Sequence, residues 1–197
     1  MNTGKGTECA SIYSCNGIIE PVVTEQSQPV QKHIVLTGMP ASGKSTIGVI
    51  LAKILGYDFV DTDLVIQRRT GRRLPELIES EGLKGFLCLE GDIVSEIGPF
   101  DTGTVIATGG SVVYSEKAMR HLREIGRIVY LEVPFENLER RLRDMKSRGV
   151  VLRPGQSLGE LYTERSVLYE RYADITVREG DLPVEEVVRF LTEALTA

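Results

Sequence analysis

From His33 onward, the hydrophobic positions of the chain switch repeatedly between two spacings. Some apolar runs are continuous and short, as expected for strands that are buried on both faces, and between them apolar residues recur at helical spacing. The strand-like runs cover residues 33–37, 57–61, 104–108, 127–133 and 175–177. Strands that alternate with helices form parallel sheets. The pattern therefore predicts a single three-layer α/β domain with a five-stranded parallel sheet flanked by helices.

The helical segments carry recognisable start and stop signals. Gly56 follows a periodic apolar stretch, which is typical of a helix end, and Pro75 suits a first helical position. Ser157 and Glu160 have the spacing of a capping box. The expected helices cover residues 44–55, 63–69, 75–80, 82–97, 115–124, 135–145, 157–172 and 184–195.

The composition favours one globular domain. The chain has 197 residues, of which 42% are hydrophobic, and this suffices for one well-formed core. Residues 1–31 are rich in Gly, Ser, Thr, Gln and Pro without periodicity, so we expect a flexible extension before a domain at 32–197. The three cysteines, Cys9, Cys15 and Cys88, match neither a disulfide framework nor a metal site. A reducing, cytoplasmic location is the expectation.

Charge and hydropathy exclude two classes of partner. The formal net charge is −5, whereas proteins that bind nucleic acid usually present a basic face. The chain also lacks an apolar run of the roughly 18 residues that would span a bilayer. We therefore expect a small-molecule partner, with neither nucleic acid nor membrane, and a monomer or weak oligomer.

The segment GMPASGKS, residues 38–45, matches the phosphate-loop pattern G-x-x-x-x-G-K-[ST] in full. It lies between a predicted strand and a predicted helix, as that motif requires. Gly38 and Gly43 allow a tight turn that points backbone N–H groups at phosphates, and Lys44 suits the β- and γ-phosphates. The hydroxyl of Ser45 suits Mg²⁺. The remaining expected nucleotide-binding residues are Met39, Pro40, Ala41, Ser42 and Thr46.

Two carboxylates follow the second predicted strand, in the sequence Asp61-Thr62-Asp63. Residues two apart on an extended strand point to the same side. Asp61 can then hold Mg²⁺ while Asp63 orients or deprotonates an acceptor hydroxyl. The alternative is that Asp63 only caps the next helix. Next to a phosphate loop, the pair favours transfer of phosphate to an alcohol.

From about Lys32 to its end, the chain resembles the shikimate kinase family. GMPASGKSTIG resembles that family's phosphate loop, VDTD its second-strand motif and ATGGS its glycine-rich substrate loop. TGRRLPELIESEG and ERSVLYERYADITV are similar to two further segments. The resemblance implies ATP- and Mg²⁺-dependent phosphorylation of shikimate to shikimate 3-phosphate, within aromatic amino acid biosynthesis.

The resemblance also implies roles for individual residues. Asp61 would serve Mg²⁺, Asp63 the substrate hydroxyls and Arg165 the substrate carboxylate. Gly109 and Gly110 would form the substrate loop.

A mobile lid at about 147–156 would bring Arg148 to the transition state, with Arg153 as the alternative. Arg141 would stack on adenine, unless it belongs to a solvated helix face.

The chain departs from the family pattern at the substrate site. The family has Phe-Arg-x-x-Glu, whose arginine clamps the substrate carboxylate; here Leu87 replaces the arginine and Glu90 keeps the glutamate. Losing one partner of such a buried contact costs about 2–5 kcal/mol. Lys84, three residues earlier, would offer only a point charge without the fork geometry. Smaller departures are Ser111 in the glycine loop and Gly149-Val150 in the lid.

Three functions remain open on this basis. The chain is a shikimate kinase with a rebuilt carboxylate site, or a related kinase with an acceptor such as homoserine or gluconate. The third alternative is a nucleotide-binding regulatory protein that has lost catalysis.

Overall fold

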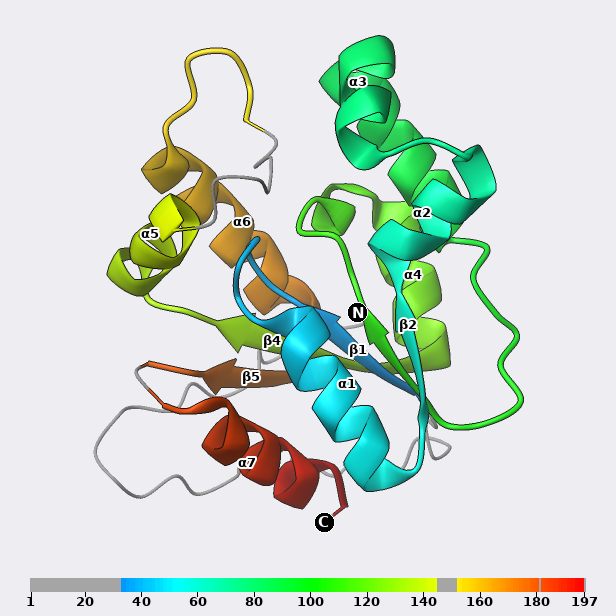
Figure 1. Cartoon of the computed structure of the whole chain (residues 1–197), viewed down its shortest axis with the longest axis vertical. Helices are drawn as coiled ribbons and strands as arrows, with labels where there is room; N and C mark the ends of the chain where they lie inside the picture. Colours follow the sequence, from blue (N-terminus) through cyan, green and yellow to red (C-terminus); the bar gives the residue numbers. More distant parts are fainter. Residues whose placement is uncertain (1–32, 145–151, 181, 197) are drawn as a thin grey trace, which may run out of the picture.

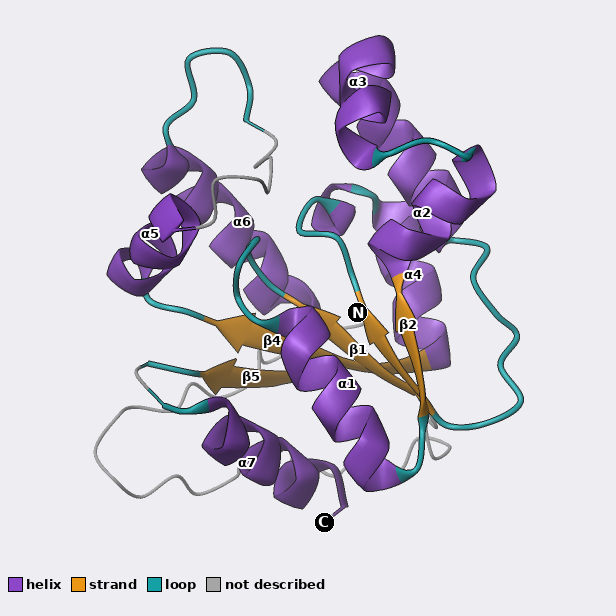
Figure 2. Ribbon diagram, viewed as in Figure 1, coloured by secondary structure: helices purple, strands orange, loops and turns teal. Residues whose placement is uncertain are grey.

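The computed structural model describes residues 33–144, 152–180 and 182–196. Its centre is a five-stranded sheet in the order β2-β3-β1-β4-β5, with every neighbouring pair parallel (Figure 2). The strands are β1 His33–Thr37, β2 Asp58–Asp61, β3 Thr104–Ala107, β4 Gly126–Glu132 and β5 Ile175–Arg178. The predicted fold class is confirmed, and each strand coincides with a predicted apolar run to within one residue at either end.

Helices connect the strands and cover both faces of the sheet (Figure 1). The α-helices are α1 Lys44–Leu55, α2 Thr62–Thr70, α3 Leu74–Val94, α4 Glu116–Ile125, α5 Phe135–Asp144, α6 Leu158–Tyr172 and α7 Val184–Thr196. A short 3₁₀ helix, η1 Val112–Tyr114, follows β3. The capping box at Ser157 and Glu160 and the helix end at Gly56 are confirmed.

The two predicted helices at 75–80 and 82–97 are a single kinked element. α3 bends at Gly82, whose φ of 67° and ψ of 172° are non-helical, and it ends at Val94 rather than Ile97. Pro75 lies in its first turn. Beyond Gly82 the helix is regular, so residues three apart there share a face.

The core divides into two main layers because successive strand residues point to opposite faces of the sheet. On one face, strand residues pack against α4 and α6: Val35, Ile106, Ile128, Met119, Leu122 and Tyr169. On the other, they pack against α1 and α7: Leu36, Val105, Val129, Ile47, Leu51 and Leu191. Each fully buried aliphatic side chain of this kind contributes about 1.5–3 kcal/mol. These layers hold the strands in register.

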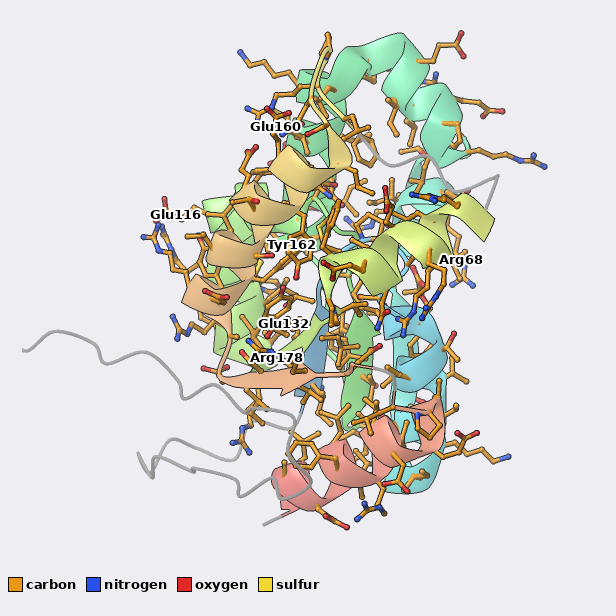
Figure 3. All side chains as sticks on the ribbon, turned by 90° about the vertical axis from the view of Figure 1, so that its left-hand side faces the viewer. Arg68, Glu116, Glu132, Glu160, Tyr162 and Arg178 are labelled. Carbon is orange, nitrogen blue, oxygen red and sulfur yellow. The ribbon has the colours of Figure 1, made fainter. Side chains whose placement is uncertain are left out.

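The register also places charged groups opposite each other at the carboxyl ends of the last two strands. Glu132 of β4 is paired in register with Arg178 of β5, and their side chains form an ion pair of 3.0 Å (Figure 3). β1 lies between β3 and β4. The loops that leave the carboxyl ends of β1, β2 and β3 therefore emerge at one edge of the sheet, where ligands of such folds bind. In the part of the chain that the structure describes, no helix is long and apolar enough to cross a membrane.

Candidate active site

The phosphate loop connects β1 to α1, as its motif predicted. Gly43 immediately precedes α1 with a φ of 84°, and Ser42 closes a turn by donating its N–H to the Met39 carbonyl at 3.1 Å. Ala41 is also held at a positive φ of 66°. A non-glycine residue in this region costs roughly 1–3 kcal/mol and is found mainly where function requires the backbone shape. The loop conformation is thus imposed by its surroundings.

Lys44 lies within this loop rather than on the surface. Its side chain is 8% exposed, and Nζ donates hydrogen bonds to the carbonyls of Gly38 at 2.9 Å and Met39 at 2.7 Å. Burial lowers the pKa of the Lys44 ammonium to about 8, although Asp63 and Asp61 oppose the shift. The first turn of α1 therefore brings a positive charge next to the backbone amides of the loop.

Ser45 and Asp61 meet at the start of α1 and the end of β2. The Ser45 hydroxyl donates to Asp61 Oδ2 at 2.8 Å. Adjacent ligands of an octahedral Mg²⁺ ion, each about 2.1 Å from the metal, lie about 3 Å apart. The two oxygens have the chemistry and spacing for neighbouring Mg²⁺ ligands. The described residues contain no cluster of three or more His, Cys, Asp or Glu that could hold a metal by itself.

The expected geometry of Asp61 and Asp63 was wrong in one respect. β2 ends at Asp61 and α2 begins at Thr62, so Asp63 lies in the first helical turn and not on an extended strand. Asp61 is the residue that caps α2, since its Oδ1 accepts the Asp63 N–H at 3.0 Å. Helix formation is favoured because this cap satisfies an otherwise unpaired amide.

Asp63 faces the predicted substrate loop at Gly109. A Cβ atom added to Gly109 would lie 3.0 Å from Asp63 Oδ1 and 2.2 Å from Glu90 Oε1. Both carboxyl groups therefore approach the same glycine, which only a residue without a side chain allows. The Gly109 N–H donates to the Thr62 hydroxyl at 3.0 Å, and this bond fixes the loop against α2.

Glu90 lies almost completely inside the protein, with 1% of its surface exposed. Neither of its carboxyl oxygens has a hydrogen-bond partner of normal geometry among the described residues. Burial raises its pKa to about 7 and the nearby Asp63 adds to the shift, whereas the Ser111 hydroxyl and Arg165 lower it. The substituted position Ser111 thus faces Glu90 within the same site.

Arg165 approaches the neighbouring glycine from α6. It is 2% exposed, its guanidinium lies over the Tyr114 ring with 5.2 Å to the centroid, and Nε donates to the Tyr114 hydroxyl at 3.3 Å. A Cβ on Gly110 would lie 3.3 Å from Arg165 Nη1. The Tyr169 hydroxyl donates to the Gly110 carbonyl at 2.5 Å. Gly109 therefore faces carboxyl groups, and the next residue, Gly110, faces the Arg165 guanidinium.

Leu87 and Lys84 lie on α3 beyond its kink. Leu87 is half-buried and is not a member of the three apolar clusters of the described residues. Lys84 is exposed. Leu87 and Glu90 are three residues apart, so they share a face of the helix.

Arg141 of α5 reaches the phosphate loop. Its Nη1 donates to Glu179 Oε2 at 3.0 Å and to the Ala41 carbonyl at 3.4 Å. Glu179, just after β5, is 3% exposed, and burial raises its pKa despite the opposing effect of Arg141. Arg141 is therefore a partly buried residue held against the loop and not only part of a solvated helix face.

The lid prediction stays a prediction, because only part of the segment 147–156 lies within the described residues. Arg148, Gly149 and Val150 lie outside the described residues. Arg153 is exposed, and its guanidinium pairs with Glu164 of α6.

Three residues of the site escaped the sequence interpretation. Tyr169 lies one helical turn after Arg165, and this i,i+4 spacing was a signal that could have been used. Tyr114 and Glu179 gave no local signal, because each meets its arginine across 51 and 38 residues of chain respectively.

A parallel sheet with a phosphate loop after its central strand, and an acidic side chain joined to that loop from a nearby strand, defines a P-loop phosphotransferase domain. A family model described as shikimate kinase matches residues 40–196. The chain belongs to the shikimate kinase family, as its motifs had suggested.

Individual relatives agree with this assignment. The shikimate kinase of Aquifex aeolicus strain VF5 is 35% identical over 156 residues, which cover 79% of this chain and 91% of the relative. That of Bordetella avium strain 197N is 34% identical over 181 residues, 91% of this chain and 85% of the relative. A solved shikimate kinase from Acinetobacter baumannii in complex with shikimate superposes with a TM-score of 0.71 at 30% identity, covering 83% of this chain and 92% of that one.

Proposed function

We propose that this protein transfers the γ-phosphoryl group of ATP to a hydroxyl of shikimate, giving shikimate 3-phosphate and ADP. One observation carries the choice of an anionic alcohol as acceptor: Asp63 and Arg165 face the consecutive glycines Gly109 and Gly110. A carboxylate suits a hydroxyl and a guanidinium suits a carboxylate. Membership of the shikimate kinase family supports shikimate as that acceptor.

On the nucleotide side, the ammonium of Lys44 and the backbone N–H groups of residues 38–46, Pro40 excepted, would neutralise the phosphates. Arg141, which Glu179 and the Ala41 carbonyl hold against the loop, would flank the adenine. Ser45 and Asp61 would hold Mg²⁺ together with the nucleotide phosphates. When bound, the metal supplies charge stabilisation to the transferred phosphoryl group.

On the acceptor side, Asp63 would orient the hydroxyl and accept its proton. The acceptor oxygen forms a bond to the γ-phosphorus while the bond from that phosphorus to the bridging oxygen of ADP breaks. ADP leaves, and the proton passes from Asp63 to solvent. We further propose that Arg148, on a lid at 147–156, stabilises the transferred group and that lid closure excludes water as a competing acceptor.

A coupled ADP-release assay with shikimate, gluconate and homoserine tests this proposal, with ³¹P NMR to identify the phosphorylated product. We expect wild-type turnover of shikimate, and a KM for shikimate at least tenfold lower in the Leu87→Arg variant, because an arginine there restores a fork for the carboxylate. If the wild type does not phosphorylate shikimate, the proposed acceptor is wrong. Nucleotide binding without turnover of any alcohol would instead favour the regulatory alternative.

A further inference from the structure

Two buried carboxyl groups of the described chain have an oxygen without a hydrogen-bond partner, and they differ in how many of their oxygens lack one. Glu179 has one such oxygen, while its other oxygen accepts from Arg141. Glu90 has two, and it is the more deeply buried. Burying an ionised carboxyl group is strongly unfavourable unless a cation or hydrogen-bond donors accompany it. An ionised Glu90 therefore requires a cation or a hydrogen-bond donor from a further group.

Among the described residues, no cation forms an ion pair with Glu90. The position one turn before Glu90 on α3 is Leu87, and Lys84 another turn back is exposed. Arg165 attracts Glu90, but its Nε is bonded to Tyr114. The described groups that act on the Glu90 carboxyl are thus the Ser111 hydroxyl, a second carboxyl group, Asp63, and the Arg165 guanidinium.

The charge balance of the pocket favours a zwitterion over an anion. Asp63 and Glu90 both approach Gly109, and Arg165 approaches Gly110, while the Lys44 ammonium, which also attracts Asp63, belongs to the phosphate loop. An acceptor with a single carboxylate adds another negative charge. An acceptor that also carries an ammonium adds none, and its cation is attracted to both carboxyl groups.

We propose that the acceptor site also takes hydroxylated α-amino acids, with Glu90 binding the ammonium group. This rests on the proposed function for the other two contacts, the acceptor hydroxyl at Asp63 and the acceptor carboxylate at Arg165. Phosphoryl transfer proceeds on the hydroxyl as for shikimate: its oxygen bonds to the γ-phosphorus, ADP leaves and the hydroxyl proton goes to Asp63. The ammonium keeps its protons throughout. Leu87 is then a specificity residue, because an arginine at this position would form an ion pair with Glu90 and compete with the ammonium group of the acceptor.

L-homoserine and 4-hydroxybutyrate form a matched pair of probes, since they share a hydroxyl, a carboxylate and a chain length and differ by the ammonium alone. The measurement is kcat/KM for ADP release with each compound. For the wild type we expect homoserine to exceed 4-hydroxybutyrate by about 10- to 100-fold, the range of one charge-assisted hydrogen bond. In Glu90→Gln this ratio should fall to within about twofold.

Two further variants keep the test decisive. Glu79→Gln changes an exposed glutamate of the same helix and should retain the wild-type ratio. Leu87→Arg leaves Glu90 in place but offers it an internal partner, so the preference for homoserine should disappear even if Glu90→Gln does not fold. Equal kcat/KM values for the two probes in the wild type, or a ratio unchanged in both Glu90→Gln and Leu87→Arg, would overturn the inference.

The shikimate assay separates this inference from the proposed function. Shikimate turnover without a preference for homoserine overturns the ammonium site alone. Homoserine turnover without shikimate turnover overturns shikimate as acceptor and supports the ammonium site. Inactivity toward shikimate, homoserine and 4-hydroxybutyrate would overturn both.

Discussion

The Ser45 hydroxyl donates a 2.8 Å hydrogen bond to Asp61 Oδ2, and this contact joins the first turn of α1 to the end of β2. It brings together, next to Lys44, the two oxygens that we propose as Mg²⁺ ligands, at the edge of the sheet where the phosphate loop lies. The same edge carries Asp63 and the Gly109–Gly110 loop. The proposed nucleotide-binding and acceptor-binding residues are therefore neighbours at Asp61 and Asp63.

Replacing Asp61 by Asn should weaken the response to Mg²⁺ more than nucleotide binding itself. An amide lacks the negative charge that a hard divalent cation prefers, so we expect the Mg²⁺ concentration for half-maximal activity to rise about tenfold or more. Initial rates over a Mg²⁺ titration at saturating ATP measure this. Asp58→Asn, at the exposed start of the same strand, is the control. An unchanged Mg²⁺ dependence in Asp61→Asn would remove this residue from the metal site.

Asp63→Asn should nearly abolish turnover while ATP affinity stays within about twofold. The carboxylate that we propose to orient the hydroxyl and accept its proton is lost, and general-base effects are typically about 10²- to 10⁴-fold. Single-turnover rates and calorimetric binding of a non-hydrolysable ATP analogue give the two values. Asp101→Asn, at an exposed position before β3, should leave both unchanged. A parallel loss of ATP affinity would show that Asp63 serves the nucleotide.

Arg165→Lys should raise the KM for shikimate at least tenfold without a matching change in the KM for ATP. Lysine keeps the charge but loses the planar fork that binds a carboxylate through two hydrogen bonds, each worth about 1.5–3 kcal/mol. Arg171→Lys, an exposed change on the same helix, is the matched control. The methyl ester of shikimate, which lacks the anion, should discriminate little between wild type and Arg165→Lys. Equal losses for the acid and the ester would contradict a carboxylate-binding role.

Glu90 should make folding stability depend on pH in a defined window. Burial raises the pKa of Glu90 from 4.5 to about 7, so between these values the folded protein holds a proton that the unfolded chain has released. Its contribution is complete below pH 4.5 and is lost as pH rises through 7, a change of about 3 kcal/mol in the free energy of unfolding.

Urea unfolding of wild type and Glu90→Gln at pH 5, 6, 7 and 8 isolates this contribution, because other titrating groups cancel in the difference. Relative to wild type, Glu90→Gln should gain about 2–3 kcal/mol in stability between pH 5 and pH 8, because about 1 kcal/mol of the full change has already occurred at pH 5. For Glu79→Gln, the difference from wild type in the free energy of unfolding should not change with pH. If the Glu90→Gln difference is also flat, Glu90 ionises normally in the folded protein.

Most of the fold could be predicted from the sequence, because its signals are local. Buried strands appear as continuous apolar runs and helices as periodic ones, so the five strands and the capping box at Ser157 and Glu160 were located correctly. The phosphate loop was equally accessible, since all its groups lie within eight consecutive residues. The prediction that Asp63 lies on an extended strand was wrong, because β2 ends at Asp61 and α2 begins at Thr62.

The chemistry of the acceptor pocket depends instead on contacts between distant segments. The sequence by itself determined that Leu87 replaces an arginine and that Glu90 remains. Only the tertiary structure decided that Glu90 is buried, that its oxygens lack a hydrogen-bond partner of normal geometry among the described residues, and that it approaches the same glycine as Asp63. The Arg165–Tyr114 contact likewise joins residues 51 positions apart. A motif consists of residues close together in the sequence, so it can be recognised there. The burial and pairing of a charge depend instead on how α3, α6 and the loop after β3 pack together, and no local sequence pattern predicts that packing.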